Sequence, residues 1–137
     1  VLGVSAEAVG VLETLLQKTV EYSKTRKQFG TVIGTFQALQ HRMADMFIEC
    51  QLARSIVVMA AMKLDSSADQ REKTKAVSAA KSRVGKAIRR VSQEAVQIHG
   101  GIGVTNELDV GHYFKRATAL EIMFGNTDYH VERFASL

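Results

Sequence analysis

Apolar residues recur every three or four positions over long stretches of this chain, which is the spacing of one face of an α-helix. The first stretch extends from about residue 6 to residue 24, and a loop with Phe29-Gly30 and Gly34 follows it. The second stretch, from about residue 36 to residue 64, is the most regular, with alternating spacings of four and three as in a heptad repeat. Its apolar positions are Leu39, Met43, Met46, Cys50, Ala53, Val57, Ala60 and Leu64.

Three further helices follow a short polar connection. One extends from about residue 70 to residue 98, and the glycines of His99–Gly103 end it. Another starts near Val110, and a last helix starts near Thr127 after a break at Gly125-Asn126. The helix over 70–98 repeats the three-four spacing with smaller side chains, at Val77, Ala80, Val84, Ala87, Val91, Ala95 and Ile98.

We therefore expect an all-α fold, an up-and-down four-helix bundle, because short connections make consecutive helices antiparallel. No stretch alternates apolar and polar residues, so no β-sheet is expected. Thr35 is the expected N-cap of the second helix, and Asn106 or Asp109 that of the fourth. The basic residues of the third helix are expected to lie in solvent. They are Lys73, Lys75, Lys81, Arg83, Lys86, Arg89 and Arg90.

The composition fits one globular domain. The chain has 137 residues, of which 46% are hydrophobic and 23% charged, values that argue against disorder. The absence of proline agrees with long helices. A single Cys excludes an intrachain disulfide framework and a cysteine-based zinc cluster. The longest apolar run, residues 56–62, is far shorter than the ~20 residues of a membrane span.

The chain begins at Val1-Leu2-Gly3, without an initiator Met and already close to a helical pattern. We therefore expect residues 1–137 to be a single domain and a fragment of a longer protein. The net charge of +4 does not by itself indicate nucleic-acid binding. No aromatic residue lies between Phe47 and Tyr113 to stack with bases beside the basic helix.

Two partial motif matches are rejected. The segment His99–Gly103 resembles the glycine-rich oxyanion loop of lipases, but no Gly-x-Ser-x-Gly motif accompanies it. The same glycines fail as a dinucleotide fingerprint, because they follow a helix and residue 106 is Asn. The histidines form no i, i+4 pair, so we expect surface or capping histidines and no metal site. They are His41, His99, His112 and His130.

Polar clusters mark three helix breaks, at residues 26–30, 97–101 and 125–128. An arginine fork together with backbone N–H groups at glycine turns can hold a pyrophosphate or a ribose. Residue types alone leave an alternative open, in which these clusters are only caps and turns.

In this order and spacing, the clusters resemble the C-terminal helical domain of the FAD-dependent acyl-CoA dehydrogenase family. The resemblance covers about residues 4–134. Its specific elements are Arg-x-Gln-Phe-Gly at residues 26–30 and Gln-Ile-x-Gly-Gly-x-Gly at residues 97–103, and it includes residues 36–40 and 125–128.

The resemblance implies that the full-length protein removes two hydrogens across the α,β bond of an acyl-CoA thioester. A base would take the α-proton, and FAD would take a hydride. It also implies an electron-transfer partner, a homo- or hetero-oligomer (dimer or tetramer), and a location in the cytoplasm, or in the mitochondrial matrix of a eukaryote. The N-terminal helical domain and middle β domain of the family are absent here. The isolated domain is therefore expected to bind FAD poorly and to be inactive.

The resemblance assigns contacts residue by residue. Arg26 would hold the FAD pyrophosphate, typically that of a neighbouring subunit, because its fork matches phosphate oxygens. Gly125 would lie at the substrate thioester. The other expected FAD contacts are Gln28, Phe29, Phe36, Gln37, Gln97, Gly100, Gly101, Asn126, Thr127 and Asp128.

One position departs from the family pattern. The catalytic Glu commonly stands where this chain has Phe124, which cannot accept a proton. Asp128 is a local substitute, and Glu121 lies about one helical turn away. In some members the base is on an earlier helix, at a position that falls at or just before Val1, about two turns ahead of Glu7. The alternative is a non-catalytic subunit that works beside a competent partner in a mixed oligomer.

Overall fold

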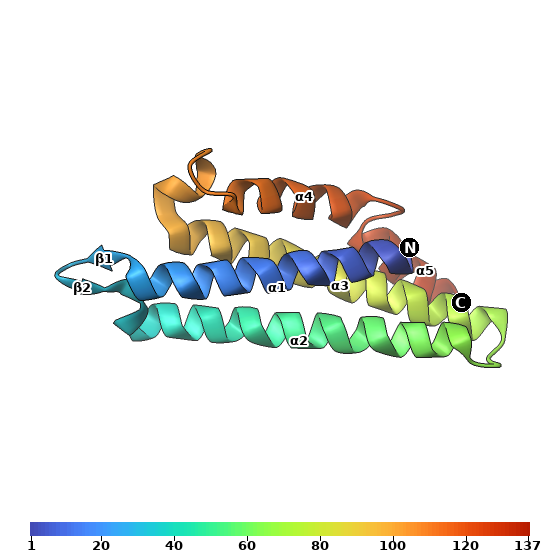
Figure 1. Cartoon of the computed structure of the whole chain (residues 1–137). Helices are drawn as coiled ribbons and strands as arrows, with labels where there is room; N and C mark the ends of the chain where they lie inside the picture. Colours follow the sequence, from blue (N-terminus) through green and yellow to red (C-terminus); the bar gives the residue numbers. More distant parts are fainter.

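The computed structural model describes residues 1–137 as a bundle of antiparallel helices (Figure 1). Helix α1 (Leu2–Thr25) is followed by strands β1 (Lys27–Gln28) and β2 (Thr31–Val32) and by the 3-10 turn η1 (Ile33–Thr35). Helices α2 (Gln37–Asp65) and α3 (Gln70–His99) form a long hairpin. The 3-10 segment η2 (Gly100–Val104), α4 (Val110–Ile122) and the short α5 (Thr127–Ser136) complete the chain.

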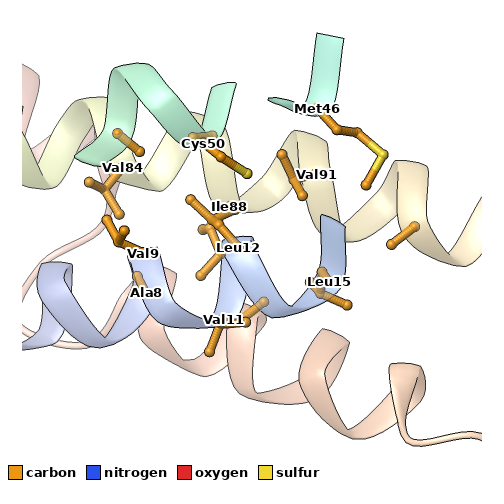
Figure 2. Packing of buried hydrophobic residues seen from close by; sticks show 14 of the residues in the cluster. Ala8, Val9, Val11, Leu12, Leu15, Met46, Cys50, Val84, Ile88 and Val91 are labelled. Atoms are coloured by element: carbon orange, nitrogen blue, oxygen red, sulfur yellow. The ribbon is translucent and has the colours of Figure 1, made fainter. Parts of the chain in front are cut away.

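Helix α3 is the centre of the bundle, since it packs against α1, α2, α4 and α5. Its small side chains, such as Ala87 and Val91, let the neighbouring helices approach closely and are fully buried. Leu12 and Leu15 of α1 and Ile88 of α3 lie between the helices in the core (Figure 2). Burying each such side chain contributes about 1.5–3 kcal/mol.

The expected all-α class and up-and-down arrangement of four main helices are confirmed, with α5 as a short addition. The heptad positions of α2 face the bundle, and Met46, Cys50, Ala53 and Ala60 among them are fully buried. Spacing alone therefore located the core-facing side of the longest helices.

The expectation of no β-sheet is wrong at one place. Strands β1 and β2 form a two-stranded antiparallel ladder in which Gln28 pairs with Thr31. The connecting residues Phe29 and Gly30 have φ values of 55° and 77°. Positive φ at both central residues is the mark of the type I′ turn that closes tight hairpins. Strands of two residues are too short to show an alternating pattern, which is why the sequence indicated only a loop.

Of the expected N-caps, Thr35 is wrong, and Asp109 holds the cap position without a cap hydrogen bond. Thr35 lies in η1, where its hydroxyl donates to the carbonyl of Val32 at 2.7 Å, and Phe36 holds the cap position of α2 without a side-chain bond. Asp109 stands at the start of α4 but forms an ion pair with Lys18 at 2.9 Å instead of a cap bond. Residue type therefore identified the cap position of α4, but not the bonding of either side chain. Asn106, the other candidate for α4, does not hold its cap position.

The expectation that the basic residues of α3 lie in solvent is wrong for Lys81, which is only 2% exposed. The expectation of surface histidines is wrong for His99 and His130, which are buried within the bundle. Each of them bonds a backbone carbonyl. None of the helices combines the length and the apolar character that a bilayer crossing requires.

Candidate functional site

A hollow of about 500 Å³ lies at the hairpin end of the bundle, between the last turn of α1, the hairpin, η1 and the end of α3. Segments more than 70 residues apart in sequence, around Arg26 and around Gly100-Gly101, meet in its wall. The expected neighbourhood of these two clusters is therefore present in the fold. The lining residues are Tyr22, Arg26, Gln28, Phe29, Ile33, Phe36, Leu39, Ile98, His99, Gly100, Gly101 and Ile102.

Arg26 stands where α1 ends, and its backbone N–H still donates to the carbonyl of Tyr22 at 2.9 Å. The N–H of Ile33 donates back to the Arg26 carbonyl at 2.8 Å and fixes the base of the hairpin. The guanidinium has no ion-pair partner, and no Asp or Glu lines the hollow. Arg26 is thus a planar cation without an ion-pair partner, and it lines a partly apolar hollow.

Two phenylalanines form one rim of the hollow. Phe29, at the hairpin tip, is 91% exposed and is held in the left-handed conformation described above. Its ring meets that of Phe36 edge to face, with centroids 6.2 Å apart. A non-glycine residue in this conformation costs about 1–3 kcal/mol and is concentrated at functional sites. The hairpin therefore presents an aromatic ring that does not serve the core of this chain.

The end of α3 also lines the hollow. Gly100 adopts a φ of 67°, which suits glycine, and its N–H donates to the carbonyls of the preceding turn, those of Val96 and Gln97. His99 stacks on the ring of Tyr22 with centroids 4.3 Å apart. Burial lowers the pKa of His99, so its ring is neutral near pH 7, with Nδ1–H donating to the Ala95 carbonyl at 2.8 Å.

Two of the expected contacts lie beside the hollow and not in its wall. Gln37 follows Phe36 at the start of α2, and Gln97 occupies the last turn of α3. Both side chains are exposed. They remain available to a ligand that extends beyond the hollow.

The third cluster, residues 125–128, lies where the chain passes from α4 into α5. Together with Phe124 we call it the α4–α5 turn, which includes the first two residues of α5. Phe124 is 63% exposed and has a φ of 59°, and Gly125 has a φ of 99°. The side chain of Asn126 caps α5 by accepting from the N–H of Tyr129 at 2.9 Å. Asp128 is exposed in the first turn of α5.

The α4–α5 turn is separated from the hollow along the length of α3. Thr127 packs on Gly85, in the middle of that helix, whereas the hollow is built around its end. At ~1.5 Å per residue, the distance along α3 is about 20 Å. A single diphosphate therefore cannot touch both clusters.

The carboxylate of Glu121 accepts three hydrogen bonds, which make it unsuited to proton abstraction. Its Oε1 accepts from the Thr127 hydroxyl at 2.8 Å, from the Thr127 N–H at 3.1 Å and from Arg89 at 3.1 Å. Burial alone would raise the pKa of Glu121, but the hydrogen bonds from Thr127 and the charges of Arg89 and Lys81 outweigh it and lower that pKa. A carboxylate stabilised in this way is a weak base.

Glu7 is engaged as well. Both of its carboxylate oxygens accept from the Arg116 guanidinium, at 2.6 and 3.0 Å, and this bonding lowers the pKa of Glu7. No group of three His, Cys, Asp or Glu side chains is placed to share a metal ion. Cys50 is buried, and burial raises the pKa of its thiol to about 12, so it is not a nucleophile near neutral pH.

The sequence did not single out the residues that hold the α4–α5 turn. Lys81, buried under the end of α4, was counted among solvated charges, and His130 among surface or capping residues. For Lys81 the sequence contains a usable signal, because Lys81, Gly85 and Arg89 are four residues apart and share one face of a helix.

The comparisons with known proteins agree on one family. The model of the acyl-CoA dehydrogenase C-terminal domain matches residues 2–136. The acyl-CoA dehydrogenase IpdE2 of Mycolicibacterium smegmatis is 45% identical over 113 residues, which cover 82% of this chain and 34% of the relative. The chain thus spans about a third of the length of the curated relatives it matches.

Solved structures show the same fold. In the ChsE4–ChsE5 complex of Mycobacterium tuberculosis, a chain superposes with a TM-score of 0.92 at 33% identity, covering 98% of this chain and 36% of that one. In the FAD complex of PigA the TM-score is 0.87 at 30% identity, covering 96% of this chain and 34% of that one. With the family model matching nearly every residue, the chain belongs to the acyl-CoA dehydrogenase family, in which it corresponds to the C-terminal domain.

Proposed function

We propose that this chain is the C-terminal domain of a longer flavoenzyme and that its hollow holds the diphosphate of FAD. The observation that carries the proposal is the meeting of Arg26 with Gly100-Gly101 in one wall that contains no carboxylate. In the proposed enzyme, the substrate is an acyl-CoA thioester that is oxidised across its α,β bond. Family membership supports this reaction class.

The residues of the hollow fit FAD on three counts. The unpaired guanidinium of Arg26 offers a two-pronged donor for phosphate oxygens. The rings of Phe29 and Phe36 offer apolar faces to a nucleotide, and the two glycines let it approach the backbone closely. FAD, when bound, would supply a hydride acceptor for the β-carbon of the thioester. The solved FAD complex of PigA supports the assignment at the level of the fold.

The distance of about 20 Å between the hollow and the α4–α5 turn supports an oligomer. One copy of the chain would meet the flavin diphosphate of its neighbour through the Arg26 hollow. Its own α4–α5 turn would stand near the reacting end of a second flavin, with Gly125 beside the thioester and Asn126, Thr127 and Asp128 along the cofactor. The proposed function also includes a separate electron-transfer partner, which would accept the electrons that the thioester gives up.

The identity of the base separates two versions of this function. Phe124 has no proton acceptor, Glu121 is occupied by Thr127, and Glu7 is paired with Arg116. Asp128 is the only carboxylate in the turn itself. In the first version the base stands ahead of Val1, on the part of the enzyme that precedes this domain.

In the second version the chain belongs to a non-catalytic subunit of a mixed oligomer. The engagement of Glu121 and Glu7 supports it, because of the three carboxylates considered as replacements for the missing Glu at position 124 only exposed Asp128 has no ion-pair partner. The solved complex of two differently named chains, ChsE4 and ChsE5, supports the existence of mixed assemblies that include a chain of this fold.

The experiment is to purify the full-length protein and record its flavin absorbance before and after addition of a panel of acyl-CoA thioesters. We expect a flavin band that at least one thioester bleaches. A colourless protein that added FAD cannot restore would refute the proposed function. Bleaching by the protein alone favours a base within the same subunit, and bleaching that requires a second subunit favours the mixed oligomer.

A further inference from the structure

Four residues of α3 lie on one helical face beneath the α4–α5 turn. They are Ser78, Lys81, Gly85 and Arg89, with spacings of three, four and four, and we call them the α3 seat. Each of them meets a residue of α4, of α5 or of the turn between these helices. The seat lies outside the hollow described above.

Lys81 completes the hydrogen bonding of the end of α4. A helix leaves its last four carbonyls without partners in the helix. Here two of them accept from backbone N–H groups: Ala119 from Met123, and Ile122 from Gly125. The remaining two, of Leu120 and Glu121, accept from Lys81 Nζ at 3.0 and 2.7 Å. The buried ammonium group therefore ends α4 at a fixed residue.

Gly85 and Arg89 fix the start of α5. A Cβ atom at Gly85 would lie 2.2 Å from Thr127 Oγ1, so only glycine lets this residue approach α3. Thr127 in turn donates two hydrogen bonds to the Glu121 carboxylate, which also accepts one from the Arg89 guanidinium. One acidic side chain thus ties the end of α4 to the first residue of α5, over the seat.

His130 holds the turn itself. Its Nε2–H donates to the Phe124 carbonyl at 2.9 Å, and its Nδ1 lies 3.4 Å from the Ser78 hydroxyl, which can donate to it. Phe124 and Gly125 have positive φ values, which are unfavourable for the first of them. Bonding of the Phe124 carbonyl to a buried side chain stabilises this conformation.

We propose that the α3 seat positions the α4–α5 turn for chemistry, with Lys81 as the principal positioning residue. Packing alone would be served at lower cost by an apolar side chain, since a buried ammonium group loses its hydration. Lys81 instead places its charge on the carbonyls that define where the turn begins. The proposal rests on the proposed function, because that function places residues 124–128 against the flavin and the thioester.

The test uses the full-length protein and the variant Lys81→Met, with Lys86→Met as the matched control. Lys86 lies on the same helix, is exposed, and forms no ion pair. Amide hydrogen exchange of the peptide covering residues 122–130 is expected to rise about tenfold in Lys81→Met and to stay unchanged in Lys86→Met. Exchange of the hairpin peptide over residues 26–36 is expected to stay unchanged in both. Equal exchange of residues 122–130 in the two variants overturns the proposal.

A milder variant covers the case in which Lys81→Met does not fold. Arg89 is largely exposed, so Arg89→Gln removes one donor to Glu121 without opening the core. It is expected to raise exchange of residues 122–130 about threefold. No rise in this variant overturns the proposal when Lys81→Met cannot be prepared.

The flavin spectrum separates a positioning role from a merely structural one. Lys81→Met is expected to retain the wild-type flavin content, because the hollow is distant, but to alter the position or fine structure of the visible flavin band. Faster exchange with an unchanged band overturns the positioning role. A wild-type protein that takes up no flavin refutes the proposed function first, and this result is evident before any variant is compared.

Discussion

Replacing Gly85 by alanine is expected to destabilise the bundle, although alanine is the better helix former. The added Cβ would lie 2.2 Å from Thr127 Oγ1 and 3.7 Å from Glu121 Oε1. The first separation is far inside van der Waals contact. Either α5 moves away from α3, or Thr127 rotates and gives up its 2.8 Å hydrogen bond to Glu121.

The size of the effect follows from three contributions. Overpacking a close helix contact costs about 1–3 kcal/mol, and losing a hydrogen bond to a carboxylate costs about 1.5–3 kcal/mol. The higher helix propensity of alanine returns about 1 kcal/mol. Because the structure relaxes by one of the two routes and not by both, the net loss is about 1 kcal/mol, or a fall in Tm of about 3 °C.

Gly10 provides the matched control. It lies in the middle of α1, and a Cβ there would meet no atom within 4 Å. Gly10→Ala is therefore expected to raise the free energy of unfolding by about 0.5–1 kcal/mol. Urea unfolding of the chain, followed by far-ultraviolet circular dichroism, measures both. If Gly85→Ala unfolds at the same urea concentration as the wild type or a higher one, the close packing of α5 on α3 is wrong.

Three further predictions concern single side chains. Burial lowers the pKa of His99 and of His130, so below their usual pKa of about 6.5 the unfolded chain takes up protons that the folded chain does not. The contribution of the two neutral rings to the free energy of unfolding is fully present above that pH. It should therefore fall towards pH 5 by up to about 1.4 kcal/mol per pH unit for each ring. Urea unfolding at pH 7.5, 6 and 5 checks this, and a flat profile would contradict it. Cys50 should react with a thiol reagent at least about 100-fold more slowly in the folded chain than in urea, and equal rates would show that it is not buried. Phe124→Gly should raise Tm, because glycine adopts the left-handed conformation of residue 124 without strain and the free energy of unfolding rises by about 0.5–1 kcal/mol. A lower Tm would show that the exposed ring is structurally needed.

The sequence predicted the helices well because their cores are built from repeated local spacing. In α2 the residues Met46, Cys50 and Ala53 follow a three-four rhythm, and all three are buried. The hairpin escaped prediction because it depends on the backbone conformation of Phe29 and Gly30, not on any apolar pattern.

The candidate site was predictable only in part. Arg26 and Gly100-Gly101 were expected to meet through a resemblance to a family, since nothing local in either segment refers to the other. The support beneath the α4–α5 turn was missed because Lys81 differs from its solvated neighbours only in what packs over it. The four-residue spacing of Lys81, Gly85 and Arg89 marks a shared helix face, but which charge on that face is buried is a property of tertiary packing.

The central claim is that Arg26 binds the diphosphate of FAD. The most direct test is the dissociation constant for FAD of the full-length apoprotein, measured for the wild type, for Arg26→Ala and for Lys27→Ala. Lys27 is the matched control, because it is an exposed cation of the same hairpin that does not line the hollow. We predict that Arg26→Ala weakens FAD binding at least about tenfold, that Arg26→Lys restores it only in part, and that Lys27→Ala has little effect. Equal affinity of the wild type and Arg26→Ala would contradict the account.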